Sequence, residues 1–143
     1  MLVSHILKAK GAAVHTAPPM TPVSEAVATL AEKRIGVLVV TDEAEGVIGI
    51  LSERDIVHAL GARGASCLSD PIEALMTRDP TCTDPGARGE QVLTRMTEGR
   101  FRHMPVLEDG KLVGMVSLGD VVKARLDELA MENASMQGMI MGH

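Results

Sequence analysis

Residues 49–55 read GILSERD, and residues 114–120 read GMVSLGD. The second stretch begins 65 positions after the first (114 minus 49), and the glycine, serine and aspartate recur at the same places. Upstream, residues 34–40 (RIGVLVV) align with residues 100–106 (RFRHMPV) at an offset of 66. Self-similarity at a fixed period indicates a repeat architecture, so the chain consists of two copies of one structural unit.

Each copy has the same order of predicted elements. Apolar residues at helical spacing come first, in residues 23–31 and 92–96, and indicate one buried helix face. Two short strands follow, and a second helix opens at the serine of the repeated motif. The predicted strand pairs are 37–41 with 47–51 and 104–107 with 112–116, the second pair joined by an Asp109-Gly110 turn.

These elements predict a mixed α/β (α+β) fold. Each repeat has a small sheet with flanking helices, and the two repeats pack about a pseudo-twofold axis, because units of this size bury little surface alone. We place the first repeat at residues 4–62, the second at residues 70–129, and a Met-rich tail at residues 130–143.

Within this division we expect two further features. Ser69-Asp70-Pro71 has the composition of a helix start and predicts that a helix begins again after the join at residues 61–70. The last helix is expected to run through residues 121–132.

Composition excludes several classes of function. The net charge is −5, and Phe101 is the only Phe, Tyr or Trp, so neither a basic surface nor stacking aromatics point to nucleic acid. The apolar run at residues 37–40 is too short for a membrane span. Cys67 and Cys82 have no metal-binding spacing, and we expect reduced thiols and a cytoplasmic location.

The repeated serine and aspartate permit two interpretations. A serine at a strand-to-helix junction with an acidic residue three positions later resembles a capping box, which is purely structural. The same helix start presents free amides to an anion such as phosphate, and its carboxylate can accept hydrogen bonds from ribose hydroxyls. Spacing alone does not separate these interpretations.

The two motifs, residues 100–106 and the Asp109-Gly110 hairpin together resemble the paired CBS-repeat proteins over nearly all of residues 4–129. In that family paired repeats form a module with two clefts, and many members bind AMP, ADP, ATP, NAD or S-adenosylmethionine there. The resemblance implies a regulatory module that binds AMP or a related adenosyl ligand. It also implies that the aspartate holds ribose and that serine and nearby basic residues face phosphate.

Carried over residue by residue, the resemblance gives one well-equipped cleft. Its ribose and phosphate side would be formed by Asp120, Ser117, Arg102 and His103. Its base-binding side, from the facing repeat, would be formed by Ile35 and the segment that contains Lys10, His15 and Thr16.

The second cleft has fewer basic residues. It would use Asp55, Ser52 and Arg54, faced by Phe101 and by the stretch that contains Thr81 and Thr83. Gly36 and Val37 occupy the positions that correspond to Arg102 and His103, so Arg54 is the one obvious cation that remains.

The three alternatives to an adenosyl-binding module are an enzyme, a metal-binding protein and a ligand-free dimer. An enzyme is not expected, because no histidine is placed as a base for either serine and no metal motif is present. Metal binding by the Met-rich tail (Met131, Met136, Met139, Met141 and His143) is a minor alternative. The stronger competitor is a ligand-free dimerisation module. In either case we expect a homodimer that uses Val122, Leu126 and Leu129, and an unknown regulated protein.

Overall fold

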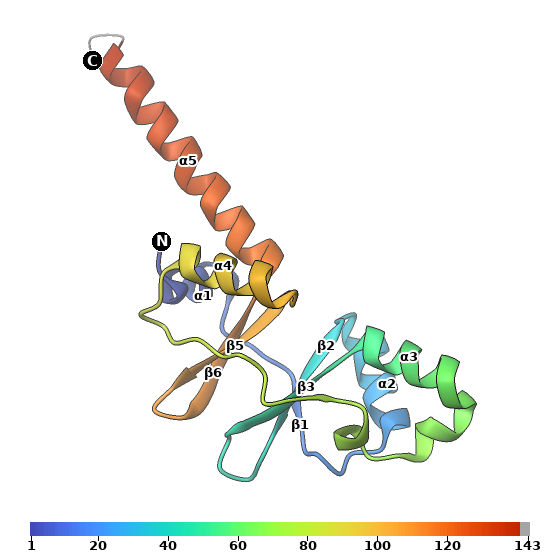
Figure 1. The fold of residues 1–143 in the computed structure, drawn as a ribbon. Coiled ribbons are helices and arrows are strands. Elements are labelled where there is room, and N and C mark those ends of the chain that lie inside the picture. Colours follow the sequence, from blue (N-terminus) through green and yellow to red (C-terminus); the bar gives the residue numbers. More distant parts are fainter. Residues whose placement is uncertain (141–143) are drawn as a thin grey trace. The chain divides into compact units, whose positions relative to one another are not determined.

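The computed structural model describes residues 1–140, which form five α-helices, six β-strands and two short 3-10 helices (Figure 1). The chain divides into two compact units. Unit 1 contains residues 1–12, 82–106 and the chain from residue 114 onward, and unit 2 contains residues 13–81 and 107–113. The predicted mixed α/β fold is confirmed, and both units draw on segments from both halves of the chain.

Unit 2 is built on a four-stranded sheet in the order β1-β2-β3-β4. β1 pairs parallel to β2, and the other neighbours are antiparallel. The strands are β1 (Thr16–Ala17), β2 (Val37–Thr41), β3 (Val47–Ser52) and β4 (Thr77–Arg78). The helices are α2 (Val23–Lys33), α3 (Glu53–Arg63) and the 3-10 helices η1 (Gly64–Ser69) and η2 (Ile72–Ala74).

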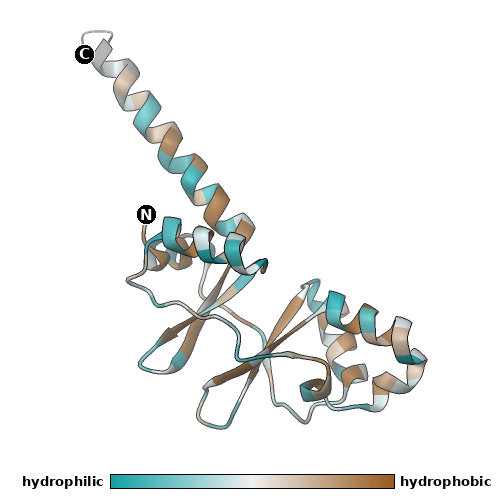
Figure 2. Cartoon of the chain, viewed as in Figure 1, coloured by the Kyte–Doolittle hydropathy of each residue, from teal (hydrophilic) through white to brown (hydrophobic). Residues whose placement is uncertain are grey.

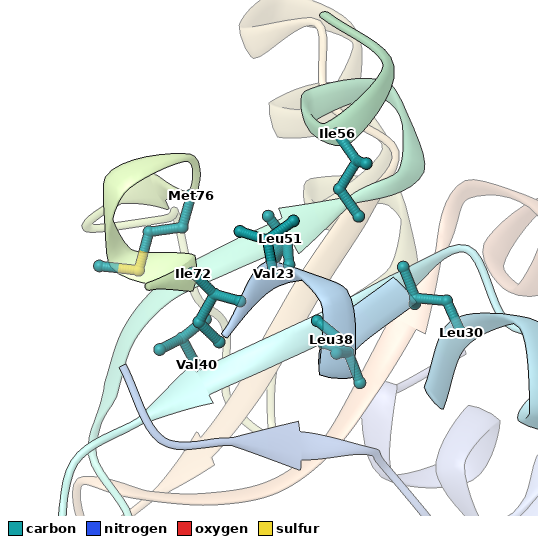
Figure 3. Close-up of a cluster of buried hydrophobic side chains, with 9 residues drawn as sticks. Val23, Leu30, Leu38, Val40, Leu51, Ile56, Ile72 and Met76 are labelled. Carbon is teal, nitrogen blue, oxygen red and sulfur yellow. The ribbon is translucent and has the colours of Figure 1, made fainter. Parts of the chain in front are cut away.

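The core of unit 2 is entirely non-aromatic, as the composition requires. Figure 3 shows Val23 and Leu30 of α2 packed over Leu38, Val40 and Leu51 of the sheet. Ile56, Ile72 and Met76 complete the cluster. Burial of each such aliphatic side chain contributes about 1.5–3 kcal/mol. Figure 2 shows the central strands as continuous hydrophobic segments, while the helices alternate between polar and apolar residues.

Unit 1 contains three helices and the base of a hairpin. The elements are α1 (Val3–Lys10), α4 (Gly89–Gly99), β5 (His103–Glu108), β6 (Lys111–Ser117) and α5 (Leu118–Ile140). β5 and β6 form a two-stranded sheet. The fully buried side chains include Val3 of α1, Val92 and Met96 of α4, Met104 of β5 and Val121 of α5. This core therefore needs α1, which comes from the other end of the sequence.

The backbone repeats as the sequence does. Helices α2 and α4 both have 11 residues and end at an arginine in the left-handed conformation, Arg34 with φ 55° and Arg100 with φ 58°. Both predicted hairpins are present. Asp109 and Gly110 have φ values of 52° and 78°, which is the two-residue turn that this dipeptide favours.

Each repeat also includes an equivalent segment that pairs with the residue just before its first helix, α2 or α4. Leu2 bridges to Arg88 in unit 1, and Pro71 bridges to Pro22 in unit 2. The start of α1 is therefore equivalent to the residues around Pro71, with an offset of 69 (71 minus 2). Repeat 1 obtains this piece from the chain that follows it, and repeat 2 obtains it from the amino-terminal residues.

The same offset explains the glycine of the repeated motif. A Cβ on Gly114 would lie 2.8 Å from Leu7, and a Cβ on Gly49 would overlap the side chain of Met76. Leu7 and Met76 are 69 positions apart (76 minus 7). Both glycines therefore let an apolar side chain of the equivalent segment lie directly on the strand.

Two expectations about helices were wrong. After Ser69-Asp70-Pro71 the chain forms only the three-residue η2, not an α-helix. The carbonyl of Asp70 accepts a hydrogen bond from Val23 N, and the amide of Ile72 donates to Thr21 O, so the backbone here pairs with another segment. The last helix does not end near Glu132, because α5 continues to Ile140 and includes most of the expected tail.

Candidate ligand site

The serine and aspartate of both motifs form complete capping boxes. In α3, Asp55 N donates to Ser52 Oγ at 3.1 Å, and Ser52 N donates to Asp55 Oδ2 at 2.9 Å. At the start of α5, Asp120 N donates to Ser117 Oγ at 3.1 Å and Ser117 N donates to Asp120 Oδ2 at 2.8 Å. The structural interpretation of the motif is therefore correct in both repeats, and any ligand role must come in addition to it.

What differs between the repeats is the surroundings of the carboxylate. Lys10, the last residue of α1, places its Nζ 2.6 Å from Asp120 Oδ2 and donates a second hydrogen bond, at 2.9 Å, to Met115 O. Both side chains of this ion pair are partly exposed. Asp120 thus caps α5 and accepts a hydrogen bond from an ammonium group with the same oxygen.

These contacts set the ionisation of Asp120. Burial alone would raise the pKa of this carboxyl, but the hydrogen bonds from Lys10 and Ser117 outweigh burial and hold the pKa below its ordinary value. Asp120 is therefore an anion at neutral pH, and its oxygens are acceptors for hydroxyl or ammonium donors.

Arg102 and His103 lie beside the same helix start. The carbonyl of Arg102 accepts a hydrogen bond from Leu118 N at 2.8 Å, which fixes the entry to β5 against the first turn of α5. Burial lowers the pKa of the half-buried His103 ring. The charges of Lys10 and Arg102 lower it further, while that of Asp120 raises it. Three basic side chains and one carboxylate therefore share this part of unit 1.

The equivalent part of unit 2 has an additional carboxylate, Glu53, next to Arg54 of its motif. Glu53 N donates to Gly36 O at 2.9 Å, the same contact that Leu118 makes with Arg102. A Cβ on Gly36 would lie 3.8 Å from Glu53 Oε2. Asp79, 69 residues after Lys10, follows the strand β4 instead of ending a helix, and its amide donates to Ile48 O. Glu53 thus places a carboxylate where unit 1 has Leu118, beside a glycine where unit 1 has Arg102.

Sequence reasoning missed two of these features. Lys10 was expected near the base of a ligand, yet its Nζ contacts the carboxylate expected to hold ribose. Glu53 could have been found from the motif alignment, where it stands opposite Leu118.

The remaining predicted residues are distributed over both units. Phe101 and Thr83 belong to unit 1 with Lys10, Arg102, His103, Ser117 and Asp120, while unit 2 contains His15, Thr16, Ile35, Ser52, Arg54, Asp55 and Thr81. Thr83 is buried and its amide donates to Pro105 O, so it supports the strand. Ile35 packs against the core of unit 2. Both predicted clefts combine residues of the two units and stay predictions.

A model of the CBS domain matches residues 10–62 and 72–127, which is most of the chain. The chain belongs to the CBS domain family. The two matched segments contain the two capping boxes, so the duplication found in the sequence is a CBS pair.

Curated relatives differ in how much more they contain. An uncharacterised 17.7 kDa protein of Acidianus ambivalens is 35% identical over 120 residues, which cover 83% of this CBS pair and 71% of the relative. The CBS domain-containing protein CBSCBSPB1 of Arabidopsis thaliana is 31% identical over 124 residues. The match covers 86% of this chain but only 22% of that protein.

Solved structures share the whole CBS-pair fold. A CBS-domain-containing protein from Agrobacterium tumefaciens is 42% identical, with a TM-score of 0.83, and the match covers 87% of this chain and 99% of that one. A CBS domain protein from Pyrobaculum aerophilum, complexed with AMP, is 26% identical, with a TM-score of 0.78 and coverage of 92% and 99%. The CBS domain pair of the protein MJ0100, in complex with 5'-methylthioadenosine and S-adenosyl-L-methionine, is 26% identical, with a TM-score of 0.78 and coverage of 90% and 98%.

A surface hollow of about 650 Å³ in unit 1 of this CBS pair lies elsewhere. It is formed by the residues after β4 and by α4, and it is lined by Thr83, Asp84, Gly86, Ala87, Glu90, Gln91, Val92, Thr94 and Arg95. Of the predicted site residues only Thr83 contributes. The hollow carries charges of both signs and lacks the cation cluster of the Asp120 site, so we base the ligand site on the latter.

Two kinds of feature are absent from residues 1–140. No helix in this range is both long and apolar enough to cross a membrane. No group of three or more His, Cys, Asp or Glu in the same range is arranged to hold a metal ion. In the Met-rich segment, Met131 and Met136 lie on exposed positions of α5, whereas Met141 and His143 lie outside the described residues.

Proposed function

We propose that this CBS pair is a regulatory module that senses adenine nucleotides and has no catalytic activity of its own. AMP is the ligand that fits best, with ADP, ATP, NAD(H) and S-adenosylmethionine as related candidates. The module would act as a homodimer in the cytoplasm and regulate a protein that its own sequence does not name. The observation that carries the proposal is the cluster of Lys10, Arg102 and His103 around Asp120.

The cluster combines the two chemistries that a nucleotide needs. An ionised carboxylate accepts hydrogen bonds from both hydroxyls of a ribose, and Asp120 is held ionised. Lys10 and Arg102 supply positive charge for a phosphate, and His103 adds a ring that can donate to it. With His103 neutral, these groups carry a net charge of +1 against the −5 of the whole chain, so the site attracts an anion locally.

Lys10 must share Asp120 with the ligand. Its Nζ already satisfies one carboxylate oxygen, so a ribose would take the second oxygen or displace the ammonium group toward the phosphate. Either arrangement keeps every charge paired. The AMP complex of the Pyrobaculum relative and the adenosyl complexes of MJ0100 support this class of ligand for a CBS pair of the same fold.

The experiment is calorimetric titration of AMP into the wild type, Asp120→Ala and Asp55→Ala. Hydrogen bonds to a charged group contribute about 1.5–3 kcal/mol, and each 1.4 kcal/mol is tenfold in affinity. Asp120→Ala is therefore expected to weaken AMP binding roughly ten- to a hundredfold. Asp55→Ala is the matched control, because it removes an identical capping box beside Glu53 and Gly36 and should leave the tighter site unchanged.

Adenosine provides the second arm of the experiment. Arg102→Ala should weaken AMP far more than adenosine, since only AMP carries a phosphate. Equal AMP affinity in the wild type and Asp120→Ala would remove the site assignment. Equal losses in both aspartate variants would show that affinity follows helix capping alone.

The second candidate function is a dimerisation module with empty clefts. The observation in its favour is that the capping boxes fully account for the serine and aspartate of both motifs. A ligand that binds only the folded state raises the melting temperature. If AMP, ADP, ATP, NAD, NADH and S-adenosylmethionine at millimolar concentration all leave the melting temperature unchanged, this second function replaces the first.

A further inference from the structure

One oxygen of the Asp120 carboxylate is fully used within the protein. Oδ2 accepts hydrogen bonds from Lys10 Nζ at 2.6 Å and from Ser117 N at 2.8 Å, which occupies both of its lone pairs. A ribose presents two neighbouring hydroxyl groups, and a carboxylate receives them best with one oxygen each. Asp120 can offer its second oxygen to a ribose only when Lys10 moves away.

The Lys10 side chain is free to make that move. It belongs to the last residue of α1 and keeps a third of its surface exposed. Gly11 follows with φ 97°, and residues 11–13 are exposed. A lysine ammonium group has three donors on a flexible four-carbon stem. Within residues 1–140, Lys10 uses two of these donors, on Asp120 Oδ2 and on Met115 O, so the group can turn toward another acceptor.

A phosphate is a stronger acceptor than Asp120 for this ammonium group. A phosphate monoester carries about 1.5–2 negative charges at neutral pH and three acceptor oxygens. Arg102 and His103 are the expected phosphate contacts, and the charges of Lys10, Arg102 and Asp120 all act on the His103 ring. A phosphate held by Arg102 and His103 therefore lies near Lys10 and draws its ammonium group from the carboxylate.

A ligand without a phosphate meets the opposite situation. Adenosine offers ribose hydroxyls but no anion, so displacement of Lys10 leaves a cation without its carboxylate partner. S-adenosylmethionine carries a sulfonium group, an ammonium group and one carboxylate, and its net positive charge is repelled by Lys10 and Arg102. The ion pair of Lys10 and Asp120 opposes both ligands.

We propose that Lys10 is a specificity-determining residue, which occupies the ribose-binding carboxylate and yields it to ligands that bring a phosphate. The site thereby selects nucleoside phosphates over adenosine and S-adenosylmethionine. This role rests on the proposed nucleotide site. It is confined to one repeat, because Asp55 Oδ2 accepts its hydrogen bond from Ser52 N and none of the ion pairs among residues 1–140 involves Asp55.

The experiment is calorimetric titration of AMP and of adenosine into the wild type, Lys10→Met and Lys8→Met at one pH and salt concentration. Lys10→Met keeps an apolar stem and removes the ammonium group. AMP should then bind about tenfold more weakly, because one hydrogen bond between charged groups is lost. Adenosine should bind about two- to fivefold more tightly, because its ribose no longer competes with an ion pair for Asp120.

Lys8→Met is the matched control. It removes the same charge from an exposed position of the same helix and should change the affinity for either ligand by less than about twofold. Lys10→Arg keeps a cation beside Asp120 and should keep the preference for AMP. Opposite shifts for the two ligands in Lys10→Met cannot come from damage to the fold, because a damaged site binds both more weakly.

The outcomes separate this role from the proposed function. If AMP binds the wild type and Asp120→Ala loses it, but Lys10→Met does not gain affinity for adenosine, the nucleotide site stands and the selection by Lys10 is wrong. A wild type that binds S-adenosylmethionine more tightly than AMP would also overturn the selection. A wild type that binds neither AMP nor adenosine would overturn both.

Discussion

At the scale of single residues, the two copies of the motif have the same hydrogen bonds but different charged neighbours. Asp55 and Asp120 make the same pair of capping hydrogen bonds, within 0.1 Å of each other. The difference between them comes from Lys10 beside Asp120 and from Glu53 beside Gly36. Electrostatic surroundings, not the motif itself, therefore distinguish the two repeats.

The same surroundings make stability depend on pH through His103. Burial and the nearby cations lower the pKa of its ring below the ordinary 6.5. Between the lowered pKa and pH 6.5, the His103 ring is therefore protonated more in the unfolded chain than in the folded chain. The free energy of unfolding is fully present above about pH 6.5 and decreases as the pH falls from there toward the lowered pKa. We expect the wild type to lose more stability than His103→Gln between pH 7.5 and 5.5, measured by urea unfolding.

The two proteins share every other titratable group, so only the difference between their pH profiles is attributed to His103. Saturating AMP should reduce that difference, because a phosphate beside the ring raises its pKa. Identical pH profiles for wild type and His103→Gln would show that the ring is as easily protonated in the folded state as in the unfolded one.

Part of this site was accessible from sequence. The motif places Ser117 and Asp120 at a helix start, and the repeat alignment places Arg102 and His103 before the matching strand. The ion pair with Lys10 was not accessible, because 110 positions separate the two residues. Their contact depends on α1 packing into the unit of the second repeat.

At the scale of elements, the helix starts give a direct test of the capping boxes. Ser52→Ala and Ser117→Ala each remove a hydroxyl that accepts a backbone hydrogen bond, and each should cost about 1 kcal/mol of unfolding free energy. Denaturant unfolding measures the loss. Thr97→Ala, which removes a hydroxyl within α4 that donates to Leu93 O, is the control and should change stability less. A Ser→Ala loss no larger than that of the control would contradict the capping role.

Local patterns predicted most elements well and failed where the backbone has a distant partner. The Asp109-Gly110 dipeptide favours a two-residue turn without help from distant residues, and the β-branched residues of β2 favour a strand. Ser69-Asp70-Pro71 has the composition of a helix start, yet its backbone pairs with residues 21–23. Composition does not reveal that long-range pairing. The structure therefore has only the single turn of η2 where the composition predicts a helix.

At the scale of the whole molecule, the units do not coincide with the repeats. Unit 1 needs residues 1–12 to cover Gly114, and unit 2 needs residues 70–81 to cover Gly49 and residues 107–113 to complete it. The period in the sequence correctly indicated two copies. It could not show that each copy takes its covering segment from the other side of the chain.

This arrangement predicts that neither half folds alone. A fragment of residues 1–69 lacks the Ile72 and Met76 side chains of its core, and a fragment of residues 70–143 lacks Val3 and Ile6. Each should give poorly dispersed amide NMR spectra, and an equimolar mixture should recover the dispersion of the intact protein. A cooperative thermal transition in either isolated fragment would contradict this.

The exchange of segments also bears on how the protein is made. Helix α1 leaves the ribosome before the rest of unit 1, and the buried Val92, Met104 and Val121 of the same unit follow by roughly ninety residues or more. At a synthesis rate of about 5–20 residues per second, the apolar face of α1 stays exposed to solvent for several seconds. Unit 2 is also incomplete until residue 113 has emerged. Folding of this CBS pair should therefore wait until nearly all of residues 1–140 have emerged, and the nascent chain should depend on chaperones until then.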